Sequence, residues 1–165
     1  MPELNVYLLR KLQERLRDEA RVEAFNMTSW LYYRENIDTT DWDPKEAPRA
    51  NACGTSACIA GHVALMENVQ FTTGPGGDVL PPPDQEIYPW SRMHSIWVST
   101  PAGDMTINQY ARQKLGLTGP QADALFNLYG VPERLRYLPQ VTAEQAVQAI
   151  DNLIATGDPK WGEIL

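Results

Sequence analysis

Residues 51–65 read NACGTSACIAGHVAL, and this stretch decides the fold that we expect for the chain. It begins with turn-forming residues and continues as a run of small and aliphatic side chains, a composition that favours a buried helix. Thr55 or Ser56 is the expected N-cap, because a side-chain hydroxyl there accepts a hydrogen bond from an amide of the first turn. We therefore predict an interior helix that reaches about residue 68, with the other helices assembled around it.

The first part of the chain predicts an amphipathic helix over residues 3–24. Leucines recur every four residues from Leu4 to Leu16, and Arg and Glu side chains occupy the opposite side of the helix. Residues 25–31 predict a turn and a short second helix that carries a large buried aromatic side chain. Residues 34–50 are polar and contain two prolines, which indicates a surface loop.

The last third of the sequence predicts three capped helices, over residues 107–115, 119–129 and 143–156. Each is preceded by a threonine with a glutamine three residues later, the spacing of a capping box, in which each side chain accepts from the other residue's backbone amide. The pairs are Thr106/Gln109, Thr118/Gln121 and Thr142/Gln145. Three glycines stand where left-handed C-terminal residues belong, namely Gly116, Gly130 and Gly157.

Between these regions, residues 69–101 are too rich in glycine and proline for a long helix. Residues 69–73 and 95–100 have β-type composition and are expected to pair as a small sheet, with an extended, exposed proline run at 81–83 between them. The predicted fold is mainly α, with α+β as the less favoured alternative. We expect one compact domain over residues 1–165, of five or six helices, with a small β-hairpin or irregular insert at about 69–101.

The 165 residues carry a formal net charge of −7, and most of the excess lies in the middle of the chain. Residues 1–25 are balanced, whereas residues 26–100 hold four basic and nine acidic side chains. Because the chain has no basic stripe to neutralise phosphates, direct nucleic-acid binding is not expected. An acidic surface serves solubility, and it can also imitate a nucleic acid or attract a basic partner.

The location that we expect is the cytoplasm. The apolar stretches are short and interrupted by charges, far below the roughly 20 residues that cross a bilayer, and the N-terminus has no apolar segment before a cleavage site. The two cysteines argue against a disulfide scaffold and suit a reducing compartment. No membrane association is therefore expected.

Residues 51–65 contain both cysteines and one of the two histidines, which makes this stretch the strongest candidate for chemistry. A thiol at a helix N-terminus has a lowered pKa, because the unpaired amides carry partial positive charge. Cys53 is the first candidate nucleophile and Cys58 the second. His94 is the candidate base, with Asp104 or Asp78 to orient it.

Residues 51–55, NACGT, resemble the nucleophile motif of ubiquitin C-terminal hydrolases, which places the catalytic cysteine at the start of a helix. The resemblance implies a cysteine hydrolase with Cys53 as the nucleophile. The chain departs from that family in two ways. It has Ala47 where the family has the glutamine of the oxyanion hole, and it is shorter than the family's catalytic domain.

Two other chemical interpretations remain open. Cys53, Cys58, His62 and His94 form a candidate Cys₂His₂ zinc set, in which Cys58 and His62 lie four residues apart and face one ion. Alternatively, Cys53 and Cys58 form a redox pair if a turn brings their Cα atoms within roughly 7 Å.

The favoured interpretation of the stretch is structural. Cysteine is among the most buried residue types, so Cys58, Ile59 and Ala60 are expected to fill space as small apolar side chains of a buried helix. Gly61 allows the close approach of a neighbouring helix, and His62 is expected to be half-buried and hydrogen-bonded. On this interpretation the protein binds no metal and no cofactor.

The order of motifs along the chain resembles a group of uncharacterised small bacterial and bacteriophage proteins. That group has a Phe-x-Met-x-x-Trp stretch, the motif CGTxxCIAG(H/W)xA, a Leu-Gly-Leu-Thr helix, and a Thr-x-x-Gln-Ala helix that ends near a tryptophan. The matching segments here are residues 25–30, 53–64, 115–126 and 142–161. The resemblance implies a phage or mobile-element origin, and it implies no particular activity.

We expect a non-enzymatic interaction or regulatory protein that binds a host or defence component through its acidic middle region. A protein partner is favoured over a small molecule. Trp90, Trp97 and Tyr88 are the candidate binding residues, because aromatic side chains dominate interface energetics. The alternatives are a cysteine-dependent hydrolase or transferase that uses Cys53 and His94, and a protein with a structural zinc site.

Overall fold

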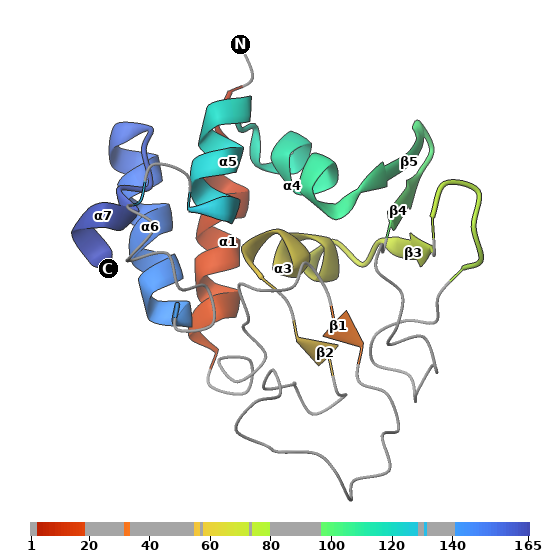
Figure 1. The fold of residues 1–165 in the computed structure, drawn as a ribbon, viewed down its shortest axis with the longest axis horizontal. Helices are drawn as coiled ribbons and strands as arrows, with labels where there is room; N and C mark the ends of the chain where they lie inside the picture. Colours follow the sequence, from red (N-terminus) through yellow and green to blue (C-terminus); the bar gives the residue numbers. More distant parts are fainter. Residues whose placement is uncertain are drawn as a thin grey trace, which may run out of the picture.

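The computed structural model describes residues 3–18, 32–33, 55–56, 58–72, 74–79, 97–128, 131 and 141–165. This part of the chain holds six helices, a three-stranded antiparallel sheet and a pair of two-residue strands (Figure 1). The prediction of a mainly α fold with a small β insert is therefore confirmed. The predicted helix at 25–31, the loop at 34–50 and the proline run at 81–83 lie outside the described residues.

Helix α1 (Val6–Arg17) is the amphipathic helix expected near the N-terminus, and it is shorter than predicted. It begins after Asn5, whose side-chain oxygen accepts from the amide of Leu8 at 3.0 Å, and it ends before Asp18, which has an extended backbone. The predicted range 3–24 therefore began too early, and it continued past Asp18, where α1 has already ended. Its inward face is apolar as expected, because Leu8, Leu12 and Leu16 are buried.

Helix α3 (Ile59–Met66) is the interior helix predicted for the cysteine-containing stretch, but its start was predicted wrongly. Cys58 is the N-cap by its extended backbone, while Thr55–Ser56 form strand β2. Strand β2 pairs antiparallel with β1 (Tyr32–Tyr33). Thr55 and Ser56, which local chemistry favoured as N-caps, thus pair instead with a segment that is distant in the sequence. No local sequence pattern predicts such a pairing. The first six of its eight residues, from Ile59 to Ala64, are all buried.

The capped helices of the last third agree closely with prediction. Helices α4 (Ile107–Leu115) and α6 (Ala143–Thr156) have the predicted bounds, and α5 (Gly119–Asn127) ends two residues early, at a left-handed Leu128. All three capping boxes are present. Gly116 and Gly157 have φ of 66° and 80°, as expected for C-terminal caps, and Gly130 lies outside the described residues. A further short helix, α7 (Trp161–Ile164), was not predicted.

The predicted pairing of residues 69–73 with 95–100 is confirmed as strands β3 (Gln70–Thr72) and β4 (Trp97–Thr100). A third strand, β5 (Gly103–Thr106), pairs antiparallel with β4 across a two-residue turn and leads directly into α4. The order in the sheet is β3-β4-β5. Phe71 and Val98 face each other in the register and are buried in the main core, so this face of the sheet packs inward.

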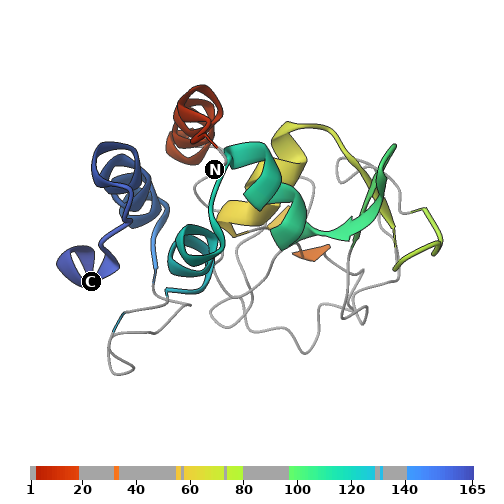
Figure 2. The same ribbon diagram turned by 90° about the horizontal axis from the view of Figure 1, so that it is seen from above.

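The C-terminal helices and the three-stranded sheet lie at opposite ends of the described structure. Both views place α6 and α7 at one end, α3 and α4 in the middle, and the three-stranded sheet at the other end (Figures 1 and 2). The main helix contacts are between α1 and α6 and between α3 and α4. No helix within the described ranges is long and apolar enough to cross a membrane.

Candidate functional site

Cys58 lies inside the protein at the start of α3. Only 2% of its surface is exposed, and burial raises its pKa to about 11 even though the backbone amides of Gly61 and Ala60 oppose the rise. Burial therefore outweighs the favourable position at a helix N-terminus, which was the reason for expecting an activated thiol. In this environment Cys58 is a poor nucleophile, and it fills space as the structural interpretation expects.

His62 lies on the same helix and is more buried than expected, with 1% of its surface exposed. Its Nδ1 accepts a hydrogen bond from the Nε of Arg15 on α1 at 3.0 Å. This bond joins α3 to α1 within the core, so His62 has a structural role in the described part of the protein.

The chemical interpretations depend on Cys53 and His94, and both lie outside the described residues. The nucleophile–base pair Cys53/His94, the redox pair and the four-ligand zinc set therefore stay predictions. Among the residues that the structure does describe, no three His, Cys, Asp or Glu side chains are grouped so that they could hold a metal ion. Of the proposed zinc ligands, Cys58 and His62 are both placed in the core.

The two aspartates predicted to orient His94 lie at the sheet. Asp104, on β5, accepts a hydrogen bond from the amide of Gly76 at 2.7 Å through its Oδ2. Asp78 is exposed, and it immediately precedes Val79, which forms an isolated antiparallel bridge with Thr72. One carboxylate thus fastens the 74–79 turn to β5, and both contribute negative charge near the same end of the molecule.

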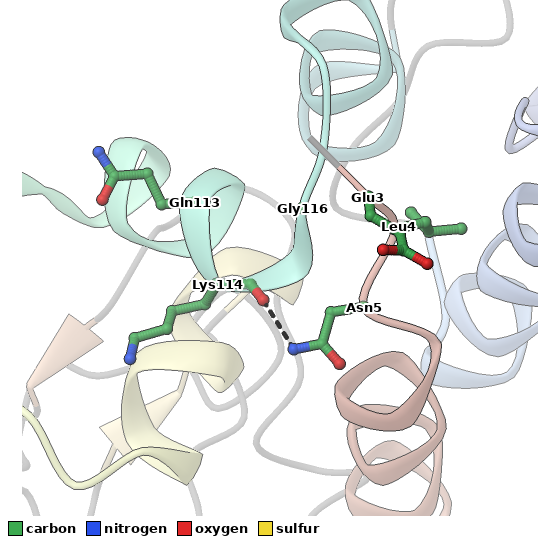
Figure 3. Close-up of a pocket in the computed structure, with 6 residues that line it drawn as sticks. All are labelled: Glu3, Leu4, Asn5, Gln113, Lys114 and Gly116. Carbon is green, nitrogen blue, oxygen red and sulfur yellow. Dashed lines mark hydrogen bonds between the residues drawn. The ribbon is translucent and has the colours of Figure 1, made fainter. Parts of the chain in front are cut away.

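A shallow depression lies where the N-terminus of α1 meets the C-terminus of α4 (Figure 3). Asn5 donates a hydrogen bond from its side-chain Nδ2 to the carbonyl oxygen of Lys114 at 3.0 Å. Its backbone N–H donates to the carbonyl oxygen of Leu115 at 2.9 Å. The side chains of Gln113 and Lys114 point away from Asn5. Since Asn5 also caps α1, the depression is a joint between two helix ends, and the polar groups of Asn5 are used by the chain itself.

The face of the sheet opposite Phe71 and Val98 is the remaining candidate. Paired residues on neighbouring strands point to the same face, and the register forms a row of Val79, Thr72, Trp97 and Thr106 across four chain segments. A second row on the same face contains Gln70, Ser99 and Asp104. We call these seven residues the outer face.

Two apolar side chains of the outer face reach the surface. Val79 is 56% exposed and is one of three large hydrophobic residues that stand out in the described structure, while Trp97 is partly buried. Thr72 lies between them in the row and is 4% exposed, with its hydroxyl donating to the carbonyl of Gly74 at 3.0 Å. The face thus presents an aliphatic and an aromatic side chain on either side of a buried, hydrogen-bonded threonine.

Sequence reasoning identified part of this face and missed the rest. Trp97 was a predicted binding residue and lies on it, whereas Trp90 and Tyr88 are outside the described residues. Val79 was missed because it is a single valine between a glycine-rich turn and a proline run, without the alternation that marks a strand. Only the bridge to Thr72 places it in the same cross-strand row as Trp97.

Comparisons of this chain with known protein families, with curated proteins and with solved structures gave no match.

Proposed function

We propose that this chain is a non-enzymatic interaction or regulatory protein, and that the outer face of its small sheet is where a protein partner binds. In line with the resemblance in motif order, the proposed setting is a phage or another mobile element, and the proposed partner is a host or defence component. The partner class and the setting rest on that resemblance. The location of the surface rests on the geometry of the sheet.

The observation that carries the proposal is the cross-strand row of Val79, Thr72 and Trp97. Trp97 on β4 and the exposed Val79, which is bridged to β3, lie on either side of Thr72 and supply apolar area with little conformational entropy to lose on binding. Interface energy is concentrated in a few such anchors, and tryptophan is enriched among them. The same end of the molecule carries Asp78 and Asp104, which fits a polar rim around an apolar centre.

The buried cysteine-containing helix has a supporting role in this proposal. Helix α3 contributes Ile59, Val63 and other residues to the core, next to its buried N-cap Cys58. It packs against α4, which follows directly from β5. The sheet is therefore attached through α4 to the most buried helix of the described structure. A rigid attachment of this kind keeps the outer face in one conformation and lowers the cost of ordering it on binding.

Site-specific photo-crosslinking tests the proposal. A photoreactive phenylalanine analogue placed at Val79 is expected to form one dominant protein adduct in cells that naturally carry the gene, because this position is exposed and tolerates a larger side chain. The same analogue at Tyr7 is the matched control, since Tyr7 is 71% exposed but lies on α1, away from the sheet.

An adduct that forms from position 79 and not from position 7 supports the proposal. The adduct yield is also expected to fall when Trp97 is replaced by serine in a variant whose helical circular dichroism is unchanged. Equal labelling from both positions, or no adduct from position 79, contradicts the assignment of the outer face.

A further inference from the structure

The segment that follows α6 packs mainly against that one helix. Gly157 ends α6 with a φ of 80°, and residues 155–158 are exposed before the chain reaches α7. The main contact of α7 within the described structure is with α6. Both views place α6 and α7 together, at the end of the molecule opposite the three-stranded sheet (Figures 1 and 2). Residues 158–165 thus lie far from the outer face.

One buried side chain anchors this segment. Trp161 is 2% exposed and belongs to the main hydrophobic cluster, whereas Gly162 and Glu163 next to it are exposed. Helix α7 has only four residues, and helices this short are not stable in water on their own. Gly162 weakens the helix further, because glycine lowers helix propensity. We therefore expect α7 to stay folded only while Trp161 is packed against the rest of the protein.

The docked conformation of the segment carries two unfavourable features. Lys160, which precedes Trp161, has a left-handed backbone with a φ of 50°, a conformation that is unfavourable for a residue with a Cβ atom. The indole Nε1–H of Trp161 is buried, and no acceptor among the described residues lies within hydrogen-bond reach of it. A buried donor of this kind has lost its bond to water without a replacement. Both features disappear when the segment leaves α6.

The polar contacts that oppose release are few and lie near the surface. Asn152 on α6 donates from Nδ2 to the carbonyl oxygen of Pro159 at 3.2 Å, and the N–H of Lys160 donates to Oδ1 of Asp158 at 2.8 Å. The Lys160 ammonium lies 3.6 Å from the Glu163 carboxylate, in an exposed pair. Water can replace each of these contacts after release, so each contributes only a small net stabilisation. The burial of Trp161 is therefore the main contribution that holds the segment.

From this balance we infer that residues 158–165 form a releasable latch. In the closed state Trp161 is docked beside α6, as the structure shows. In the open state α7 unfolds and Trp161 enters water, while α1 and α3 to α6 stay folded. The latch gives the protein two states that differ in exposed apolar surface at the end opposite the outer face. Local opening of this kind is typical of segments with few buried apolar contacts.

Hydrogen exchange of the full-length protein, followed by NMR, tests the inference. The reporters are the Trp161 indole N–H and the Leu165 amide, which donates to the carbonyl oxygen of Trp161 at 3.0 Å. The reference is the amide of Ile150, in the buried part of α6. After correction for intrinsic exchange rates, both reporters should give the same opening constant, at least about a hundredfold larger than that of Ile150.

Two results of this experiment would overturn the inference. If the Trp161 indole exchanges at the opening constant of Ile150, Trp161 leaves its place only when the helices unfold. If the Leu165 amide exchanges much faster than the indole, the final turn frays while Trp161 stays docked.

Two substitutions at Lys160 test whether its backbone conformation favours opening. Lys160→Gly and Lys160→Ala both remove the ion pair with Glu163, but only glycine removes the left-handed penalty. The opening constant of the Trp161 indole should be about three- to tenfold smaller in the glycine variant than in the alanine variant. Exchange of Ile150 should be the same in both. Equal opening constants in the two variants, or an equal change at Ile150, would contradict the latch.

Gly162→Ala tests the weakness of α7 independently of Lys160. A Cβ atom on Gly162 would have no atom within 4 Å among its neighbours, so the substitution causes no clash. The higher helix propensity of alanine should lower the opening constant of the Trp161 indole about two- to fivefold and leave Ile150 unchanged. An unchanged indole opening constant would show that the folding of α7 is not coupled to the docking of Trp161, against the inference.

Discussion

At the scale of single residues, a thiol at the start of a helix is reactive only where water and reagents reach it. Cys58 has the helix position that favours a thiolate, yet its pKa is raised to about 11 because the sulfur is buried. Desolvation of the charged form therefore outweighs the partial charges of the helix amides at this residue. Cys58 therefore fills space in the core, and its thiol is a poor nucleophile there.

Cys58 is accordingly expected to resist alkylation in the folded protein. In a Cys53→Ser background, iodoacetamide labelling of Cys58 at pH 8 should be at least about a hundredfold slower in the folded protein than in urea. The raised pKa alone lowers the share of Cys58 that is present as thiolate by roughly that factor. Intact-mass measurement over time gives the rate. The Cys58→Ser background reports Cys53 in the same assay, and rapid labelling of Cys58 without denaturant would show that its burial is not maintained in solution.

At the scale of helices and strands, the glycine at the end of α4 lies against the backbone at the start of α1. A Cβ atom on Gly116 would lie 1.9 Å from the carbonyl oxygen of Glu3 and 3.3 Å from the amide nitrogen of Asn5. The residue also has a φ of 66°, which favours glycine. Gly116 therefore permits both the helix end and the joint with Asn5.

Gly116→Ala is expected to destabilise the protein by about 2–5 kcal/mol, the sum of a left-handed backbone penalty and a steric clash. Gly157→Ala is the matched control. Gly157 ends α6 with a φ of 80°, but a Cβ atom added there would have its nearest neighbouring atom at 3.7 Å. That variant should lose only about 1–2 kcal/mol. Urea unfolding followed by circular dichroism measures both, and equal losses would show that the contact with Glu3 has no energetic weight.

The pairing of α1 with α6 includes a charged contact whose contribution depends on pH. Hydrogen bonding by the Gln13 side chain and the nearby guanidinium groups of Arg10 and Arg17 lower the pKa of Asp151. A carboxyl with a lowered pKa in the folded state stabilises the protein above its ordinary pKa. That stabilisation is lost as the pH falls toward the lowered value.

Between neutral and acidic pH, the Asp151→Asn variant should therefore lose less unfolding free energy than the wild-type protein does. The effect should be modest, since the pair is exposed and screened by solvent. Urea titrations of the wild-type protein and the variant at a series of pH values provide the comparison. Identical pH profiles for the two proteins would mean that Asp151 makes no pH-dependent contribution.

How far the sequence predicted these elements depends on whether their signals are local. Helices α4 and α6 were predicted to the residue, because a capping box and a terminal glycine act within one turn of each end. The start of α3 was predicted wrongly, because Thr55–Ser56 pair with Tyr32–Tyr33, more than twenty residues earlier in the sequence. Strand β5 was missed because Gly103 and Asp104 are poor strand formers, and it is the pairing with β4 that makes them a strand.

The candidate site was less predictable than the fold for the same reason. Trp97 was a candidate because aromatic residues are common at interfaces, an argument that needs only composition. Val79, which belongs to the same cross-strand row, could be found only through the bridge to Thr72. Local sequence patterns identify residues that are suited to binding, and long-range pairing decides which of them lie side by side.

At the scale of the whole molecule, the described structure separates stability from the proposed binding surface. The buried residues of α1, α3, α4, α5 and α6 form one continuous hydrophobic cluster. The sheet lies at the end away from α6 and α7, with one face in that cluster and the other carrying Val79 and Trp97 (Figure 2). Changes to the outer face are therefore expected to affect binding more than folding.

The most direct measurement of this claim is the affinity of the partner recovered by crosslinking for three purified proteins: wild type, Val79→Asp and Tyr7→Asp. Both substitutions place a carboxylate at a strongly exposed apolar position, so folding should be retained in each. A charge buried at an apolar interface centre without a partner costs about 2 kcal/mol or more, so Val79→Asp should weaken binding by at least about tenfold. Tyr7→Asp should leave the affinity within about twofold of wild type, since exposed substitutions outside an interface change free energies little. Unchanged affinity for Val79→Asp, or equal weakening by both substitutions, would contradict the account.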